Sequence, residues 1–437
     1  MEFTNVNQLP RSTLRTLWTR FAFGARKGAR LGADGLNRRK FVVALYFPSM
    51  RITDVDAVWL HCPIPPEQQH VSDFGRITSF DMTLVTLATD TGLTGYGEAK
   101  AGVGSAAVCA SLVTCVREEL RPLLVGQDPR EITRLWERMY NGPRDHYALA
   151  RGRAFPILGR RGLTVAAISG VDMALWDVLG KSLGCPVVQL LGGACRQAMP
   201  AYASGGWADE AGIGQQLLGY VDKGFRAVKM RVGVMDGHVD ASVARVRAAR
   251  RALGPQIKLM ADAHGTYSAA EARRFCDGVA DCDLFWFEEP VNPDDRDAAA
   301  EVRAYATMPI AAGESEFTRF DFRDLIQHRA VDVLQPDLAI CGGITEGRRI
   351  AALAEAHQLA LAPHLWGSAL SFAAGLHLAF ASPSAIILEY SLGANPLLRE
   401  LPEEQVEVRD GMIAAPVKPG LGVTPRSEFV ERYAVRR

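Results

Sequence analysis

Hydrophobic and polar residues alternate with a period that changes along the chain and divides it into two main parts. Arg51–Ile64 and Asp81–Thr89 alternate as strands do, and a polar loop from Pro65 to Phe80 joins them. The turn sequence DTGLTG (90–95) follows and predicts a β-hairpin. Apolar residues at helical spacing come next, at 106–123, 128–140 and 163–183. Strands followed by helices predict a separate α+β domain over residues 50–190.

From residue 191 the pattern changes, because short apolar runs alternate with Ala-, Arg- and Glu-rich helical segments. The runs are Met199–Ala203, Ala227–Val232, Lys258–Ala263, Leu284–Phe287, Pro309–Ala312, Asp332–Leu338, Leu359–Pro363 and Ala385–Leu388. Eight strands that alternate with helices predict a modified TIM (β/α) barrel over residues 191–391. The tail, residues 392–437, has turn signals and no barrel period, and we expect it to pack back on the N-terminal capping domain.

The first 48 residues differ from the rest, with nine Lys/Arg and only two acids, Glu2 and Asp34. Their apolar run Phe41–Phe47 is far shorter than the roughly 20 residues of a membrane span. An Arg-rich, acid-poor leader is compatible with a transit peptide. We expect instead that residues 1–49 are disordered, or that Met50 is the natural start.

Composition narrows the classes of function. The 437 residues are 48% hydrophobic, enough for a large core, and carry a net charge of +0. A neutral chain gives no indication of a nucleic-acid or anionic-membrane partner. The eight cysteines show no CxxC spacing, so we expect a reduced, cytoplasmic protein.

Three acidic residues recur at equal spacing, each at the end of an apolar run. They are Asp262, Glu288 and Glu314, and both gaps are 26 residues (288 − 262 and 314 − 288). A single strand-end acid can be a helix N-cap, but the C-terminal ends of all barrel strands meet at one face. Three carboxylates there tolerate one another only around a cation. Hard oxygen ligands favour Mg²⁺.

The other strand ends carry further ionisable residues. Lys229 and Arg231 share one side of their strand, where either could hold a substrate carboxylate. His364 has a pKa suited to a general base, and Asp337 on the neighbouring strand could orient it. Glu389, if protonated, could hydrogen-bond an enediolate. Together these residues predict removal of the proton next to a carboxylate group of a small-molecule substrate.

The same residues resemble a known pattern over about residues 50–430, that of the enolase superfamily in its mandelate racemase-like branch. The resemblance implies a capping domain, a modified barrel, Mg²⁺ and a homo-oligomer. It implies the ligands Asp262, Glu288 and Glu314, the dyad Asp337 and His364, and the electrophile Glu389.

One departure from the family pattern bears on the reaction. The strand-two pair is usually Lys-x-Lys with the second Lys as a base, but here that position is Arg231, which stays protonated. Loss of one base disfavours two-base racemisation and leaves one-base dehydration of a sugar acid to a 2-keto-3-deoxy acid. The alternatives are a racemase or epimerase of a 2-hydroxy acid, with Lys229 or His264 as the opposite base, and a non-catalytic carboxylate-binding relative.

We expect substrate choice in the capping domain, because the resemblance implies that two of its loops, here 65–80 and 98–106, close over the barrel mouth. Candidate residues in or near them are Asp73, Arg76, Lys100, Arg144 and His146. They could recognise hydroxyls or a distal carboxylate. His264, two residues after Asp262, faces the same side and could bind a substrate hydroxyl or act as a second acid.

Overall fold

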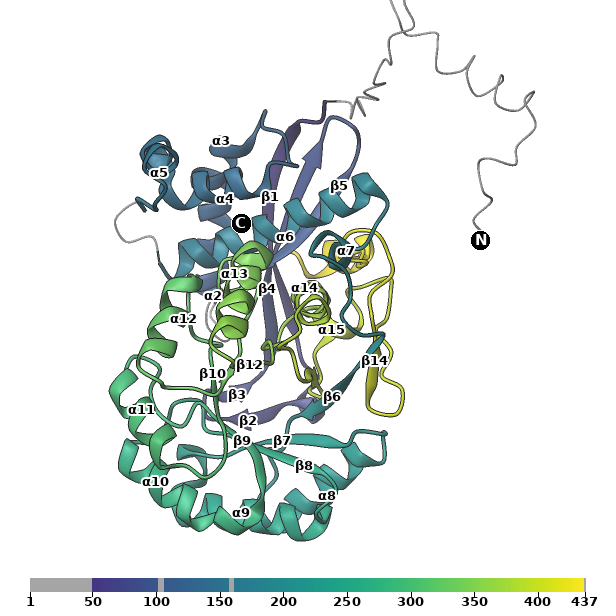
Figure 1. Ribbon diagram of the computed structural model, residues 1–437. Coiled ribbons are helices and arrows are strands. Elements are labelled where there is room, and N and C mark those ends of the chain that lie inside the picture. The colour runs from purple at the N-terminus through teal and green to yellow at the C-terminus, as the bar shows by residue number, and fades with distance from the viewer. Residues whose placement is uncertain (1–48, 101–105, 157–160, 436–437) are drawn as a thin grey trace, which may run out of the picture. The chain divides into compact units, whose positions relative to one another are not determined.

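The computed structural model describes residues 49–100, 106–156 and 161–435 (Figure 1). The expectation for residues 1–49 therefore falls almost entirely outside the described residues, as does most of the loop 98–106.

Three antiparallel strands begin the described chain: β1 (Ile52–Pro63), β4 (Ser79–Thr89) and β5 (Thr94–Ala99), in the order β1-β4-β5. The predicted hairpin at DTGLTG is confirmed as the β4–β5 pair. A short hairpin of β2 (His70–Ser72) and β3 (Gly75–Ile77) interrupts the connection between β1 and β4. This hairpin matters below, because it carries residues to the barrel mouth.

Helices follow the sheet, as the apolar spacing predicts. They are α2 (Ala106–Thr114), a π-helical turn (Cys115–Leu120), α3 (Arg121–Leu124), α4 (Ile132–Asn141), α5 (Asp145–Arg151), α6 (Leu163–Leu183) and α7 (Val187–Leu190). Helix α6 packs directly on β5, since a Cβ at Gly97 would collide with the backbone oxygen of Gly170. By length and composition α6 could cross a membrane, but 83% of its apolar window is buried inside the protein.

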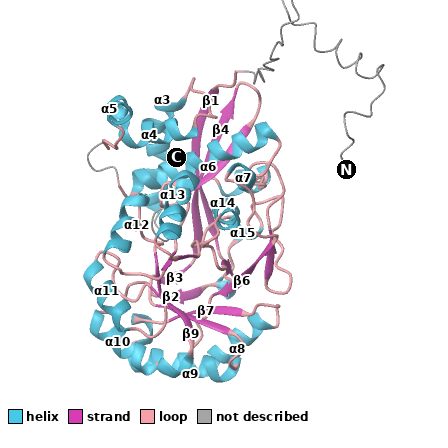
Figure 2. Cartoon of the chain, viewed as in Figure 1, coloured by secondary structure: helices cyan, strands magenta, loops and turns pink. Residues whose placement is uncertain are grey.

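The second part is a curled sheet of parallel strands with helices along its outer side (Figure 2). The strands are β6 (Ala198–Ser204), β7 (Ala227–Arg231), β8 (Lys258–Asp262), β9 (Leu284–Glu288), β10 (Ile310–Ala312), β11 (Val333–Leu334), β12 (Ala360–Leu361) and β13 (Leu388–Ser391). The helices are α8 (Glu210–Val221), α9 (Val239–Leu253), α10 (Ala269–Gly278), α11 (Arg296–Tyr305), α12 (Thr318–Gln327), α13 (Gly343–Ala356) and α14 (Ala369–Ala381). The predicted fold, a modified barrel with an α+β capping domain, is confirmed.

Strand β13 pairs with β6, and a parallel bridge between Leu361 and Ala385 links the other edge strand, β12, to the segment that leads into β13. A separate buried cluster fills the interior with one residue from each of the eight strand segments: Tyr202, Ala227, Met260, Trp286, Ala311, Val333, Ala362 and Ile387. Strand β11 is shorter than the predicted run Asp332–Leu338, because Pro336 has no N–H to donate to a neighbouring strand.

The C-terminal segment contacts both parts. Strand β14 (Met412–Ala414) pairs antiparallel with β6, which the sequence pattern did not predict. After α15 (Pro396–Arg399) and α16 (Ser427–Tyr433), the chain forms a bridge between Ala434 and Leu60 of β1. The tail therefore contacts the capping domain at this bridge.

His377 on α14 joins three segments of the core. The ring is fully buried, its Nδ1 accepts a hydrogen bond from Val188 N at 3.0 Å, and its Nε2 lies 3.2 Å from Leu421 O. A neutral ring with the proton on Nε2 satisfies both contacts. Burial lowers the pKa of His377 to about 4, although the Leu421 carbonyl opposes the shift.

Acid is therefore expected to destabilise the fold through His377. Below pH 6.5, the ordinary pKa of histidine, His377 is protonated in the unfolded chain but stays neutral in the folded chain down to about pH 4. The free energy of unfolding is therefore highest above pH 6.5 and decreases as the pH falls toward 4. Between pH 7 and 4.5 the free energy of unfolding should decrease by about 2 kcal/mol through His377. Urea unfolding of the wild type and of His377→Gln, which does not titrate, checks it. Equal pH dependence in the two proteins would contradict the assignment.

Candidate active site

Three carboxylates converge at the C-terminal ends of adjacent barrel strands. Asp262 ends β8 and Glu288 ends β9, directly opposite each other in the parallel register. Glu314 follows β10 by two residues. Oxygen atoms of the three side chains lie within 4.8 Å of one another. The structure thus brings together the triad that the 26-residue spacing predicts.

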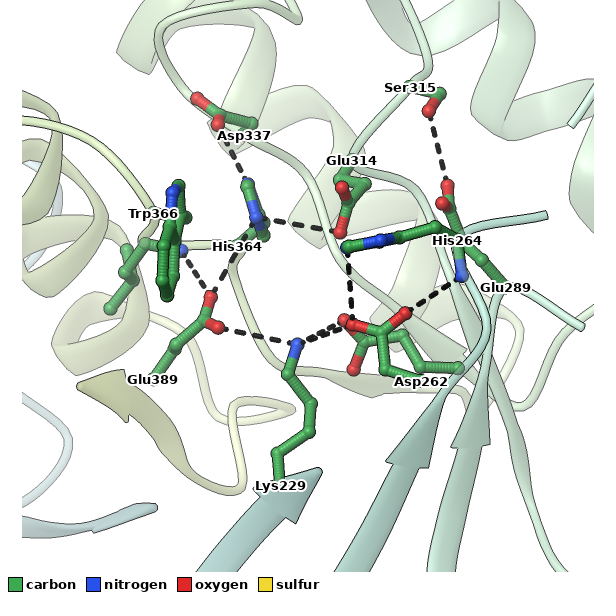
Figure 3. A network of polar contacts seen from close by, with 12 residues as sticks. Lys229, Asp262, His264, Glu289, Glu314, Ser315, Asp337, His364, Trp366 and Glu389 are labelled. Carbon is green, nitrogen blue, oxygen red and sulfur yellow. Dashed lines mark hydrogen bonds and ion pairs between the residues drawn. The ribbon is translucent and has the colours of Figure 1, made fainter. Parts of the chain in front are cut away.

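Two cations from β7 lie against this triad. Lys229 Nζ is 3.1 Å from Asp262 Oδ2, pairs with Glu288, and is 3.3 Å from Glu389 Oε1 (Figure 3). Arg231 pairs with Asp262. Burial would lower the pKa of Lys229, but Glu288 and Glu389 raise it well above its ordinary value, so the ammonium stays charged.

The charges in this cluster do not balance. Four carboxylates (Asp262, Glu288, Glu314 and Glu389) face two cations (Lys229 and Arg231), which leaves two negative charges. Asp262 Oδ2, Glu314 Oε2 and Glu389 Oε1 are buried without a hydrogen bond of good geometry. Carboxylate oxygens that lack a hydrogen bond and carry two excess charges fit one divalent cation.

His364 lies across this cluster, beyond β12. Its Nδ1 is 2.8 Å from Asp337 Oδ2, and its Nε2 is 3.4 Å from Glu314 and 4.0 Å from Glu389 (Figure 3). Burial would lower the pKa of His364, but Glu314 and Glu389 outweigh burial and raise it. The ring is therefore held with Nδ1–H on Asp337 and Nε2 directed at the carboxylates.

Asp337 has a second partner, which comes from the capping domain. Lys100, directly after β5, places Nζ 2.6 Å from Asp337 Oδ2 and donates to Trp366 O, and its backbone N–H donates to Ala339 O at 3.1 Å. Burial opposes ionisation of Asp337, but Lys100 and His364 lower its pKa. The sequence predicts substrate binding for Lys100. The structure places its ammonium on the dyad instead, and a contact with substrate stays a prediction.

A second His–Asp pair lies on another side of the mouth. His264 Nδ1 is 2.8 Å from Asp73 Oδ2, and its Nε2 is 3.9 Å from Asp262. Asp73 occupies the tight turn between β2 and β3, so the capping hairpin reaches the barrel. Phe74 packs on the His264 ring, with centroids 5.0 Å apart. Burial and Arg231 lower the pKa of His264, and Asp73 opposes them.

Glu389, on β13, accepts a hydrogen bond from Leu365 N at 2.9 Å. Burial would raise its pKa, but Lys229 and His364 lower it, so the side chain is ionised in this arrangement. Protonation of Glu389 for a hydrogen bond to an enediolate stays a prediction.

Sequence reasoning assigned no role to Glu289, although the EEP motif displays it. Glu289 is buried at φ +37° and accepts from Ser315 Oγ at 3.2 Å (Figure 3). Burial, with Glu314 and Glu316 nearby, raises its pKa well above the ordinary value. Glu289 is thus a neighbour of the triad that takes up a proton more readily than an ordinary glutamate.

A cavity of about 360 Å³ opens over these groups. Its lining includes Lys100, Arg231, His264, Glu314, His364 and Trp366. Three predicted substrate residues lie elsewhere: Arg76 is exposed, Arg144 donates to Pro156 O at 3.2 Å, and the side chain of His146 is 64% exposed. They do not line the cavity in the part of the chain that the structure describes. Their roles stay predictions.

Comparisons with known proteins agree with this arrangement. The model "Enolase C-terminal domain-like" matches residues 213–429, and "Mandelate racemase / muconate lactonizing enzyme, N-terminal domain" matches residues 57–192. These two segments correspond to the barrel and to the capping domain.

Individual relatives match along most of their length. The chain is 37% identical over 364 residues to D-galactonate dehydratase of Ralstonia pickettii, covering 80% of this chain and 91% of the relative. It is 35% identical over 353 residues to D-galactarolactone cycloisomerase of Agrobacterium fabrum, covering 78% and 88%. A crystal structure of an enolase from Bradyrhizobium complexed with magnesium and mandelic acid is 32% identical, with a TM-score of 0.77, over 89% of this chain and 99% of that one.

The family resemblance inferred from the sequence is confirmed by these matches. With both domains matched and relatives above 30% identity aligned over nearly their whole length, the chain belongs to the mandelate racemase/muconate lactonizing enzyme family of the enolase superfamily.

Proposed function

We propose that the protein dehydrates a sugar acid to a 2-keto-3-deoxy acid in a Mg²⁺-dependent reaction. The observation that carries the proposal is the position of the His364–Asp337 dyad. The Nε2 atom of His364 faces the space between the three carboxylates and the two cations of β7. Relatives named D-galactonate dehydratase and arabinonate dehydratase, at 33–37% identity, support the class of substrate.

Asp262, Glu288 and Glu314 would hold the Mg²⁺, which stabilises negative charge on the substrate carboxylate and enediolate when bound. The relative from Bradyrhizobium, complexed with magnesium and the 2-hydroxy acid mandelic acid, supports this choice of metal and ligand. Lys229 and Arg231 lie beside the triad and would bind the substrate carboxylate.

His364 performs the proton transfers. Because Asp337 holds its Nδ1–H, Nε2 is free to take the proton from C2 of the substrate. The electron pair of the broken C–H bond forms the enediolate. It then expels the C3 hydroxyl, which takes a proton from His364 or His264 and leaves as water. The resulting enol takes up a proton at C3, loses the proton of its C2 hydroxyl and becomes the 2-keto acid.

The second His–Asp pair keeps racemisation or epimerisation as the runner-up. His264 and His364 line the same cavity from different strands, each oriented by a carboxylate. If they approach opposite faces of C2, they would supply the two bases that Arg231 does not.

Replacement of His364 tests the proposal directly. His364→Asn keeps a hydrogen bond to Asp337 but has no base, so 2-keto acid formation should fall about 10²- to 10⁴-fold or more. The assay is semicarbazone detection over a panel of aldonic and aldaric acids with Mg²⁺. A variant as active as the wild type on the same substrate would support the non-catalytic alternative.

Metal binding is tested without turnover. Mg²⁺ should raise the melting temperature of the EDTA-treated wild type, because it binds only the folded state. Glu314→Gln should weaken Mg²⁺ binding in calorimetry at least about 10-fold. Glu289→Gln, which changes a neighbouring side chain outside the triad, should retain Mg²⁺ binding. Equal affinity in all three proteins would exclude the triad as the ligand set.

Lys100 is expected to act as a positioning residue through Asp337. Lys100→Met should lower kcat at least about 10-fold with little change in KM, the effect of losing one charge-assisted hydrogen bond. Lys100→Arg should restore part of the rate. An increase confined to KM would show instead that Lys100 binds substrate, as the sequence suggested.

A further inference from the structure

The lining of the cavity contains two chemically different groups of residues, with further polar residues beside them. One part is the charged group already described: Lys100, Arg231, His264, Glu314 and His364. The other, called here the apolar wall, consists of Phe74, Ile77, Phe80, Phe317, Ile340 and Leu397.

The apolar wall is assembled from segments far apart in the sequence. Phe74, Ile77 and Phe80 come from the hairpin β2–β3 and the start of β4, Phe317 precedes α12, and Ile340 follows β11. Leu397, in α15, is 2% exposed. The capping domain, the barrel loops and the tail all contribute apolar side chains. The apolar wall is therefore a part of the cavity lining that does not depend on a single residue.

Polar side chains that line the cavity beside the wall are already hydrogen-bonded within the protein. Ser79 Oγ donates to Asp81 Oδ2 at 2.7 Å. Asp81 Oδ1 also accepts from Trp59 Nε1 at 2.6 Å and lies 2.8 Å from His61 Nδ1. The carboxylate is therefore already engaged by three side chains from β1 and β4.

The same holds on the barrel side. Asn395 Nδ2 donates to Gly367 O at 2.9 Å, and its Oδ1 accepts from Leu397 N at 3.0 Å. Glu98 accepts from Ser368 Oγ at 2.6 Å and from Ser368 N at 3.0 Å. These contacts hold loops in place and leave few polar atoms to receive a ligand.

Unsatisfied polar atoms concentrate at the charged part. Among the described lining residues, Arg231 Nε and Glu314 Oε2 are buried without a hydrogen-bond partner, and the charged groups of both residues contact only other members of the site. A ligand is thus offered polar partners around its carboxylate and its first carbons, and apolar surface beyond them.

We propose that the cavity selects a 2,3-dihydroxy acid whose far end is apolar, of the terminally deoxygenated sugar-acid class such as a 6-deoxyhexonate. The inference rests on the proposed function of the same site and adds the substrate class. A terminal hydroxyl placed against the apolar wall loses its water and finds no partner, so the fully hydroxylated acid should be disfavoured about 10-fold or more.

Matched pairs of substrates test the inference with the full-length protein and Mg²⁺. Each 6-deoxyhexonate is compared with the hexonate of the same stereochemistry, so that one oxygen is the whole difference. For the pair that is turned over, kcat/KM should be about 10-fold or more higher for the deoxy acid. Equal or higher kcat/KM for the hexonate would overturn the inference while leaving dehydration intact.

A measurement of substrate binding distinguishes failure of the substrate-class inference from failure of the proposed dehydration. Calorimetric titration of His364→Asn with the same pairs gives a Kd ratio without turnover. If the wild type forms no 2-keto acid from any pair, dehydration fails, and the Kd ratio still decides the inference. Tighter binding of the deoxy acid supports it. Equal or weaker binding rejects it.

One position in the apolar wall offers a matched pair of variants. Ile340 is 8% exposed and lines the cavity. Ile340→Thr adds a hydroxyl to the wall. Ile340→Val is the control, because valine has nearly the same shape as threonine but no hydroxyl. The preference for the deoxy acid should narrow several-fold in the Thr variant relative to the Val variant. An identical preference in both would show that the wall does not contact the end of the substrate.

Discussion

The site depends on one electrostatic constraint: four carboxylates are held at the mouth of a barrel, largely out of water, and among the described residues two cations, Lys229 and Arg231, pair with them. Buried charge of one sign is costly unless it is matched. Lys229 matches part of it from β7 and contacts three of the four carboxylates. The remaining charge is the reason the site is suited to a divalent cation, and with it to an anionic substrate and an anionic intermediate.

The capping domain completes this site at two points. Lys100 contacts the carboxylate that orients His364, and Asp73 contacts the ring of His264. Both histidines follow barrel strands. The partner of His264, Asp73, belongs to the capping domain. The partner of His364, Asp337, belongs to the barrel but also contacts Lys100 of the capping domain. The position of the hairpin β2–β3 at the mouth therefore fixes the ring of His264 through Asp73 and Phe74. The same hairpin brings Phe74 and Ile77 into the apolar wall, so the element that orients His264 would also contact the far end of the proposed substrate.

Much of this arrangement was readable from the sequence, because the barrel converts spacing along the chain into position at one face. Asp262, Glu288 and Glu314 follow from that rule, and so does the pairing of Asp337 with His364 on neighbouring strands. The rule does not give contacts between domains. Nothing local to Lys100 indicates that it meets Asp337, and nothing in the tail indicates that β14 pairs with β6.

The predicted substrate residues show most clearly what the sequence does not give. These residues are Arg76, Arg144 and His146. Charge near a loop suggested them, but whether a side chain enters a cavity depends on the turn that carries it, and these three lie outside the described lining. The apolar wall, by contrast, has no signature in the sequence. It exists only after the hairpin, two barrel loops and α15 are brought together, and it would distinguish this chain from a relative named for galactonate.

The central claim is that this cluster removes the C2 proton of a 2,3-dihydroxy acid and that water then leaves from C3. The most direct measurement is NMR analysis of the product formed by the full-length protein with Mg²⁺ in D₂O. The account predicts a 2-keto acid with one solvent deuteron at C3 and no hydrogen retained at C2. Deuterium at C2 of an acid that keeps its C3 hydroxyl would contradict dehydration and establish racemisation or epimerisation instead.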